Sequence, residues 1–284
     1  MILTIYTISA FSATLPDKKY AQIEKNHFGI IVLPQEKEFF VRILIYNIAY
    51  GTGSPGSEPG RLVTGHRYLS APERPFRKIG RFVGSVAPDV AGLLETDLGS
   101  RRTGGMNQPE EVASYCGMIP FGSNKYGPAS KWGRLPYLRY QGNALLTRGE
   151  PESRERGYLP LGMKRLVLSV RYNGIRIMLV HLALRREVRR AQLAALAEWI
   201  DPGEPTVLAG DFNTFGGAAE LTEFCARCRL QSINLLHRPT YPAWAPVREL
   251  DYMLISPHLE VTAFRVPHLF FSDHLPLVAD LRHR

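Results

Sequence analysis

One short stretch, residues 207–215, constrains the fold of this 284-residue chain more than any other. Its apolar beginning, 207–209, is followed by a glycine, which is typical of a buried strand. Side chains alternate along an extended backbone, so Asp211 and Asn213 project together from the strand end. A carboxylate beside an amide suits metal-assisted chemistry on a phosphate. The same pair also suits a turn that caps the next helix.

Apolar, β-rich runs with a polar residue at or beside one end recur along the chain. We predict such strands at 41–47, 90–94, 142–147, 165–171, 175–181, 250–255, 261–266 and 275–281. The catalytic-type residues at or beside the strand ends are Asn47, Glu95, His181, Asp211 with Asn213, Asp251, and Asp273 with His274. Each alone has a structural explanation, as a turn residue, a helix cap, a core histidine or a surface charge. Polar groups at buried strand ends need partners or ligands, so the whole set favours one functional site.

The remaining pattern predicts a single α/β domain. Apolar residues at helical spacing predict helices at 75–86, 110–115, 185–200 and 218–230. Asn173-Gly174 between two alternating runs predicts a β-hairpin. Strands mixed with helices throughout predict mixed sheets, which we assign to a domain over 39–284. Residues 1–38 lack clear periodicity and are interpreted as a poorly ordered extension, or as the result of a start codon assigned too far upstream.

The composition points to an anionic partner and to no membrane anchor. The net charge is +9 and the sequence pI is about 9.6, as expected for a protein that binds nucleic acid, an acidic membrane surface or a phosphorylated small molecule. No apolar run approaches the ~20 residues of a membrane helix. The weakly apolar stretch 2–13 lacks the basic start of a signal peptide, so we favour a cytoplasmic monomer and leave secretion open.

The cysteines predict neither a disulfide framework nor a structural zinc site. There are three of them, and a zinc site needs four ligands. Cys225 and Cys228 form a C-x-x-C within the predicted helix 218–230. We interpret them as packed side chains, with a redox or metal role as the alternative.

The chemistry that fits the strand-end residues is phosphoester hydrolysis with a divalent metal ion. A hard cation prefers oxygen ligands, which Glu95 and Asn47 supply. The chain has no H-E-x-x-H motif and no histidine-cysteine cluster, so Mg²⁺, with Mn²⁺ as the alternative ion, is favoured over zinc.

Further strand-end residues suit the acid, base and phosphate-binding roles. Asp211 or His274 can align the attacking water, and Asp251 can orient a histidine base through its second ring nitrogen. His181 and Asn213 can donate hydrogen bonds to the phosphate oxygens where charge develops.

These motifs resemble the endonuclease/exonuclease/phosphatase superfamily, metal-dependent phosphodiesterases that include abasic-site endonucleases, DNase-I-like nucleases, neutral sphingomyelinases and inositol-polyphosphate phosphatases. The matching pieces run in the family's order from about residue 41 to the end: Tyr46-Asn47, Leu94-Glu95, 142–147, Val180-His181-Leu182, 210–213, Leu250-Asp251-Tyr252 and Ser272-Asp273-His274. The resemblance implies a DNase-I-like four-layer sandwich, an α/β (α+β) fold in which two packed mixed β-sheets are flanked by helices.

The resemblance also implies roles for individual residues. Glu95 would be the principal magnesium ligand, helped by Asn47. His181 and Asn213 would hold the phosphate, and Asp211 would orient the nucleophile or protonate the leaving group. Asp251 would pair with His274, and Asp273 would be a further metal ligand or a carboxylate that supports the ligands.

The substrate is less constrained than the reaction. Ala49 stands where abasic-site endonucleases usually carry a second acidic residue, which separates the chain from that branch. The basic and aromatic segment 125–139 favours nucleic acid, because rings stack on bases and cations follow the backbone; the alternative is a surface hairpin whose rings pack inward. Candidate substrate-binding residues are Asn143, Arg101 and Arg185.

Two other functions remain open. One is hydrolysis of a phospholipid or a sugar phosphate, as in sphingomyelinase-like or inositol-phosphate enzymes. The other is a non-catalytic anion-binding module that keeps the fold without the chemistry.

Overall fold

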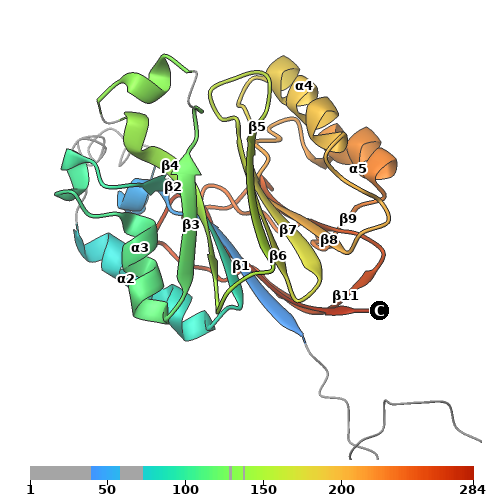
Figure 1. Ribbon diagram of the computed structural model, residues 1–284, viewed down its shortest axis with the longest axis horizontal. Coiled ribbons are helices and arrows are strands. Elements are labelled where there is room, and N and C mark those ends of the chain that lie inside the picture. Colours follow the sequence, from blue (N-terminus) through green and yellow to red (C-terminus); the bar gives the residue numbers. More distant parts are fainter. Residues whose placement is uncertain (1–39, 58–72, 128–129, 137) are drawn as a thin grey trace, which may run out of the picture. The chain divides into compact units, whose positions relative to one another are not determined.

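A computed structural model describes residues 40–57, 73–127, 130–136 and 138–284. The predicted extension 1–38 and positions 128, 129 and 137 of the basic and aromatic segment 125–139 lie outside the described residues. The described part contains two six-stranded mixed sheets; the first combines strands from the first half of the chain with the last two strands, and the second is built from strands in between (Figure 1).

The first sheet has the order β11-β12-β1-β2-β4-β3. Its strands are β1 (Val41–Asn47), β2 (Val90–Asp97), β3 (Ile119–Asn124), β4 (Gln141–Thr147), β11 (Leu259–Arg265) and β12 (Leu277–His283). β1 pairs in parallel with β2 and antiparallel with β12. The C-terminal ends of β1 and β2 therefore lie side by side, which places Asn47 near the segment that carries Glu95.

The second sheet has the order β5-β6-β7-β8-β10-β9. Its strands are β5 (Ser153–Tyr158), β6 (Leu166–Tyr172), β7 (Ile175–His181), β8 (Thr206–Asp211), β9 (Gln231–Ser232) and β10 (Asp251–Ile255). The predicted hairpin joins β6 to β7. Asn173 and Gly174 at its turn have φ values of 49° and 72°, the left-handed backbone that a two-residue hairpin turn requires.

Helices cover the outer face of each sheet (Figure 1). Helices α2 (Glu73–Val86) and α3 (Gln108–Cys116) pack on the first sheet, and α4 (Arg186–Ala197) and α5 (Thr222–Cys228) pack on the second. Short 3-10 turns lie at η1 (Ala49–Gly51), η3 (Arg101–Thr103), η4 (Trp132–Arg134), η5 (Leu138–Tyr140) and η6 (Ala218–Leu221). No described helix is both long and apolar enough to span a bilayer.

Three apolar layers hold these elements together. Alternating residues of β1 show why: Ile43 and Ile45 enter the core between the sheets, while Leu44 and Tyr46 pack under α2 and α3. A third layer lies between the second sheet and α4 and α5, and it includes Cys228, with Cys225 packed against it. The predicted four-layer sandwich is confirmed, since each sheet is buried on both faces.

The sequence pattern missed three strands, β3, β5 and β9. β5 is a sheet edge with the polar sequence Ser-Arg-Glu-Arg-Gly-Tyr, and β3 is an edge strand that contains Pro120 and Gly122. Edge strands face solvent and carry little apolar periodicity, so the pattern that marks buried strands is absent from them.

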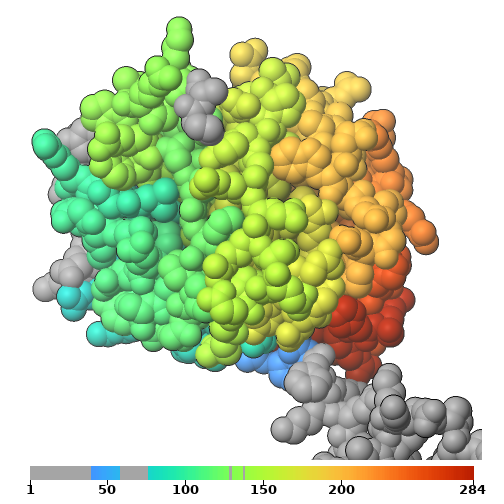
Figure 2. Space-filling model, viewed as in Figure 1, coloured from blue at the N-terminus to red at the C-terminus, as the bar shows by residue number. Residues whose placement is uncertain are grey.

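Figure 2 shows how segments from the first half of the chain, in teal and green, meet those of the second half, in yellow and orange, across one face.

Candidate active site

Strand register brings three of the predicted residues into one row of the second sheet. His181 ends β7 and is the partner of Asp211, which ends β8. Asp211 is in turn the partner of Asp251, the first residue of antiparallel β10. The three side chains therefore lie at the same edge of the sheet.

The Gly-Asp-Phe-Asn segment has a specific local geometry. Gly210 has φ of 143°, and a Cβ built there would lie 1.9 Å from the carbonyl oxygen of Val180, so only glycine fits this approach of β8 to β7. Asn213 has φ of 52°, and its N–H donates to Asp211 Oδ1 at 3.0 Å. Its Nδ2 donates to the carbonyl of Leu182 at 2.9 Å. The segment thus forms an Asp/Asn turn and also presents both side chains at the strand end.

Asn47 joins the first sheet to this row. It ends β1, and its Nδ2 donates to Asp211 Oδ2 at 3.1 Å. Its Oδ1 accepts from the N–H of Ala49 at 3.1 Å and keeps a second lone pair. The amide oxygen is therefore oriented by the backbone that follows β1.

Glu95 lies within β2, where the sequence predicted a strand end. The pairing of β2 with β4 shifts register between Leu93 and Thr96, and Glu95 has φ of 52° there. A bulge of this kind redirects a side chain out of the strand's regular alternation. The N–H of Glu95 donates to Asn143 Oδ1 at 3.1 Å, so Asn143 on β4 helps to hold the bulge. The strand then continues to Asp97.

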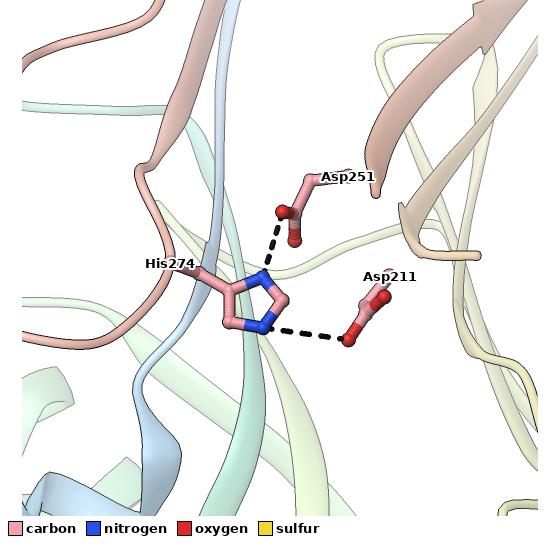
Figure 3. Close-up of side chains that lie close together, drawn as sticks. All are labelled: Asp211, Asp251 and His274. Atoms are coloured by element: carbon pink, nitrogen blue, oxygen red, sulfur yellow. Dashed lines mark hydrogen bonds and ion pairs between the residues drawn. The ribbon is translucent and has the colours of Figure 1, made fainter. Parts of the chain in front are cut away.

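His274 lies between two carboxylates (Figure 3). Its Nδ1 is 2.8 Å from Asp251 Oδ2, and its Nε2 is 3.9 Å from Asp211 Oδ2. Burial disfavours the charged ring, but Asp251 and Asp211 outweigh it and raise the pKa of His274 to about 10. The pKa of Asp211 is held well below its ordinary value because His181 and His274 overcome the opposing effect of burial. Without a metal ion, His274 is therefore protonated and Asp211 is ionised.

His181 connects this row with Glu95. Its Nε2 is 3.2 Å from Asp211 Oδ2 and 3.8 Å from Glu95 Oε1. Burial and the charge of Lys164 lower the pKa of His181, which keeps the ring neutral. Nδ1 is buried without a partner among the described residues, so the polar contacts of the ring run through Nε2.

Two lysines that the sequence analysis did not single out also belong to the site. Lys164, just before β6, contacts His181 Nε2, and its Nζ is 3.6 Å from Glu95 Oε1. Lys125 is buried and donates to the hydroxyl of Tyr50. Burial would raise the pKa of Glu95, but the positive charge of Lys164, together with the adjacent His181 ring, lowers it overall. The only sequence signal was weak, a basic residue just before a predicted strand and another in the basic segment 125–139.

The oxygen donors at the site fit a magnesium ion. Because His181 Nε2 lies within 4 Å of both Glu95 and Asp211, the two carboxylates border the same space, and the oxygen of Asn47 is oriented next to them. An all-oxygen set suits Mg²⁺. Asp211, Asp251 and His274 also place ligand atoms within 4.8 Å of one another. His274 Nδ1 is already hydrogen-bonded to Asp251, however, so the set that includes Glu95 fits better.

The remaining predicted residues lie outside this row. Asp273 is half-buried beside His274, contributes to its raised pKa, and its Oδ1 accepts from Ser272 Oγ at 3.3 Å. Arg101 in η3 and Arg185 before α4 have exposed side chains. Within the described ranges no hydrogen bond or ion pair links either arginine to the cluster, and their assignment to substrate binding stays a prediction.

Two nearby arginines, Arg102 and Arg189, have structural roles. Arg102 is buried and its Nη1 lies 3.1 Å from Asp97 Oδ2. Arg189 on α4 is buried and its Nη2 lies 2.5 Å from Glu220 Oε2. Since each guanidinium is engaged by a carboxylate, neither is available as an anion-binding group at the surface.

The basic and aromatic segment divides between core and surface. Lys125 and Tyr126 are buried, whereas Lys131, Trp132 and Arg134 are exposed. The inward-packing alternative thus holds at the start of the segment, and the exposed part remains available to a partner.

Comparison with known proteins places the chain in a family. A family model described as "Endonuclease/Exonuclease/phosphatase family" matches residues 44–274. The uncharacterized protein YbhP of Escherichia coli K12 is 32% identical over 166 residues, which cover 50% of this chain and 63% of YbhP. The chain therefore spans less than two thirds of that relative.

Solved structures show the same fold. An endonuclease/exonuclease/phosphatase from Beutenbergia cavernae superposes with a TM-score of 0.66 at 22% identity, over 86% of this chain and 72% of that one. The catalytic domain of human Nocturnin, solved with a bound sulfate anion, superposes with a TM-score of 0.63 at 20% identity, over 86% and 94%. With a family model that spans most of its length, the chain belongs to the endonuclease/exonuclease/phosphatase family.

Proposed function

We propose that the protein is a Mg²⁺-dependent phosphodiester hydrolase in which water attacks phosphorus. One observation carries this proposal: a single carboxylate oxygen, Asp211 Oδ2, lies 3.1 Å from Asn47 Nδ2, 3.2 Å from His181 Nε2 and 3.9 Å from His274 Nε2. Residues from both sheets therefore converge on one ionised oxygen, as acid-base chemistry on a phosphate requires.

The metal ion would be held by Glu95 and Asn47, with Asp273 as a further carboxylate nearby. When bound, it supplies positive charge to a phosphate oxygen. The predicted alternatives of Mg²⁺ and Mn²⁺ share this oxygen-ligand chemistry.

Asp211 and His274 would divide the proton transfers. Asp211, ionised and beside Asn47, is suited to orient the water and accept its proton as the new P–O bond forms. His274, kept protonated by Asp251, is suited to donate a proton toward the leaving oxygen as the ester P–O bond breaks. His181 Nε2–H and the free N–H of the Asn213 amide would donate to the phosphate oxygens.

Nucleic acid is the favoured substrate. The net charge of +9 and the exposed Lys131, Trp132 and Arg134 support it, because cations follow the backbone and rings stack on bases. A phospholipid is the second candidate, supported by Leu235 and Leu236, which are 82% and 75% exposed in the loop before β10.

Hydrolysis of bis-p-nitrophenyl phosphate tests the reaction class. We expect turnover with Mg²⁺ that is abolished by a chelator and reduced about 1000-fold in Glu95→Ala, because the ion and its ligand act in the transition state. If neither wild type nor Glu95→Ala hydrolyses the ester with Mg²⁺, the protein is a non-catalytic anion-binding module; equal turnover by the two would remove Glu95 from the metal site.

A substrate panel then tests the preference for nucleic acid. Single- and double-stranded DNA, RNA, sphingomyelin and inositol phosphates would be compared with Mg²⁺, Mn²⁺ and chelator. Nuclease activity should weaken steeply with salt. Activity on phospholipid and none on nucleic acid would overturn the preference.

A further inference from the structure

Lys125 is a buried cation with no carboxylate partner. Its side chain belongs to a residue only 8% exposed, and its Nζ donates one hydrogen bond, to the hydroxyl of Tyr50. The rings of Tyr50 and Tyr126 lie 5.2 Å from Nζ, and in the described part of the chain no carboxylate oxygen comes within 4.0 Å of it. An ammonium has three donors, so two remain for a ligand, and a buried charge is costly unless it is paired.

A second lysine lies next to it. The N–H of Arg165 donates to the carbonyl of Lys125 at 3.2 Å, which ties the segment carrying Lys164 to the segment carrying Lys125. Burial lowers the pKa of Lys125 to about 8; the charge of Glu95 opposes this shift and the charge of Lys164 adds to it. Two neighbouring cations repel each other, so they are expected where a multivalent anion binds.

The position of Lys125 is set by a strained turn. Ala49 and Tyr50 have φ values of 45° and 56°, a left-handed conformation that non-glycine residues rarely adopt. The carbonyl of Tyr50 accepts from Arg102 Nη1 at 3.1 Å and from Gln108 Nε2 at 2.8 Å. These two bonds hold the turn, and the turn aims the Tyr50 hydroxyl at Lys125. Strain maintained in this way is typical of functional sites.

We propose that Lys125 and Lys164 bind a second phosphate group of the substrate, adjacent to the phosphate under attack, with Tyr50 as a positioning residue for Lys125. This inference rests on the proposed function and narrows its substrate class to phosphoesters that carry a neighbouring phosphate. The phosphate under attack carries a single negative charge as a diester, which the metal ion, His181 and Asn213 already face. Lys164 is partly engaged by Glu95 and His181, so Lys125 keeps the larger number of unused donors for a further anion, and Lys164 adds its positive charge.

A matched pair of chromogenic substrates tests the subsite. Thymidine 5′-(4-nitrophenyl phosphate) with a free 3′-hydroxyl and the same compound with a 3′-phosphate share the leaving group and differ only in the second phosphate. We expect wild type to favour the 3′-phosphorylated compound about 10-fold or more in kcat/KM, and Lys125→Met to bring that ratio close to one. Lys78→Met removes an exposed charge on α2, from a lysine outside the proposed site, and should keep the ratio. An unchanged ratio in Lys125→Met, or a wild type that shows no preference in either this pair or a matched pair of inositol phosphates, overturns the proposal.

Two further arms keep the test decisive. Tyr50→Phe deletes only the hydroxyl and should lower the ratio partway, which covers the case in which Lys125→Met fails to fold. Inositol 1,4,5-trisphosphate against inositol 1-phosphate repeats the comparison on a sugar, so it distinguishes a nucleotide source of the second phosphate from an inositol source; a preference in either pair supports the subsite.

Binding without turnover separates this inference from the proposed function. In chelator, thymidine 3′,5′-bisphosphate should bind wild type about 10-fold more tightly than thymidine 5′-monophosphate by calorimetry, and Lys125→Met should lose the difference. If neither nitrophenyl substrate is hydrolysed with Mg²⁺ or Mn²⁺, the proposed function fails, and this binding difference alone decides whether the subsite exists. Equal affinities for the two nucleotides overturn it.

Discussion

The two sides of the site solve the problem of buried charge in different ways. On one side, the His274 ring lies between the carboxylates of Asp251 and Asp211, and opposite charges meet at contact distance. On the other side, Lys125 and Lys164 lie near the carboxylate of Glu95, and cations outnumber the anion they face.

This difference indicates a division of labour. A histidine saturated by carboxylates has its proton and its orientation set by the protein, as proton transfer demands. Ammonium groups with unused donors are set up for a ligand, because their remaining hydrogen bonds must come from elsewhere. The carboxylate side is thus suited to chemistry and the lysine side to binding.

The largest expected difference concerns turnover on the carboxylate side. We expect His274→Ala to lower kcat about 100-fold or more with little change in KM, as loss of a positioned acid or base does. The measurement is steady-state kinetics at saturating Mg²⁺, with circular dichroism to confirm folding. Retained turnover would show that proton transfer resides elsewhere.

The lysine side should respond in the other kinetic parameter. We expect Lys164→Met to raise KM about 10-fold and to change kcat less, because a charge-assisted contact to substrate is worth about 1.5–3 kcal/mol. Saturating Mg²⁺ is needed in this assay, since removing a cation beside Glu95 also changes metal affinity. A fall in kcat with unchanged KM would place Lys164 in the chemical step and remove the contrast.

The two sides should also impose opposite pH dependence on the stability of the metal-free protein. The pKa of His274 is raised to about 10, so its contribution to stability is complete below about pH 6.5 and is lost as the pH rises toward 10. The pKa of Lys125 is lowered to about 8 in the folded state. Lys125 therefore loses its proton at a lower pH in the folded state than in the unfolded chain, and the protein gains stability as the pH rises above 8.

Thermal unfolding in chelator between pH 6.5 and 10 measures this contrast. As the pH rises, the Tm of wild type should fall relative to that of His274→Ala and rise relative to that of Lys125→Met. Shifts of a few degrees are expected, since 1 kcal/mol moves the Tm of a domain this size by about 2–4 °C. Parallel curves for all three proteins would contradict the assignment of these pKa values.

The smallest effect is expected away from both sides. Arg101→Ala and Arg185→Ala remove the exposed arginines that the sequence analysis proposed for substrate binding. We expect kcat/KM to change less than about twofold at 0.15 M salt, because exposed charges are screened over a Debye length of about 8 Å. A tenfold loss in either variant would show that the substrate extends beyond the cluster to that arginine.

Much of the fold was predictable because its signals are local. The buried strands β1, β7, β8 and β10 were each marked by a short apolar run, and Asn173-Gly174 marked the hairpin. The edge strands β3 and β5 were not, because a strand that faces solvent needs no apolar alternation. Because the central strands are buried on both faces, their apolar runs can be recognised in the sequence.

The positions of the candidate site residues could be predicted from the sequence to a similar degree. Residues that end regular strands, such as Asn47, His181 and Asp211, were found from their position alone. The sequence did not show which arginines are buried, because a guanidinium in a loop or near a helix start has the same sequence context whether it faces solvent or a buried carboxylate. Arg102 and Arg189 have the buried partners, and their neighbours Arg101 and Arg185 do not.

The sequence by itself determined the strand-end chemistry and the family of this protein, since period-two burial and short motifs depend only on neighbours along the chain. Only the tertiary structure decided that a bulge carries Glu95 and that residues of both sheets converge on a carboxylate oxygen of Asp211. It also decided that Lys125 and Lys164 lie near the carboxylate of Glu95. Those facts depend on contacts between segments tens to hundreds of residues apart, and no local pattern specifies which loop cation is buried by such contacts and which is left in water.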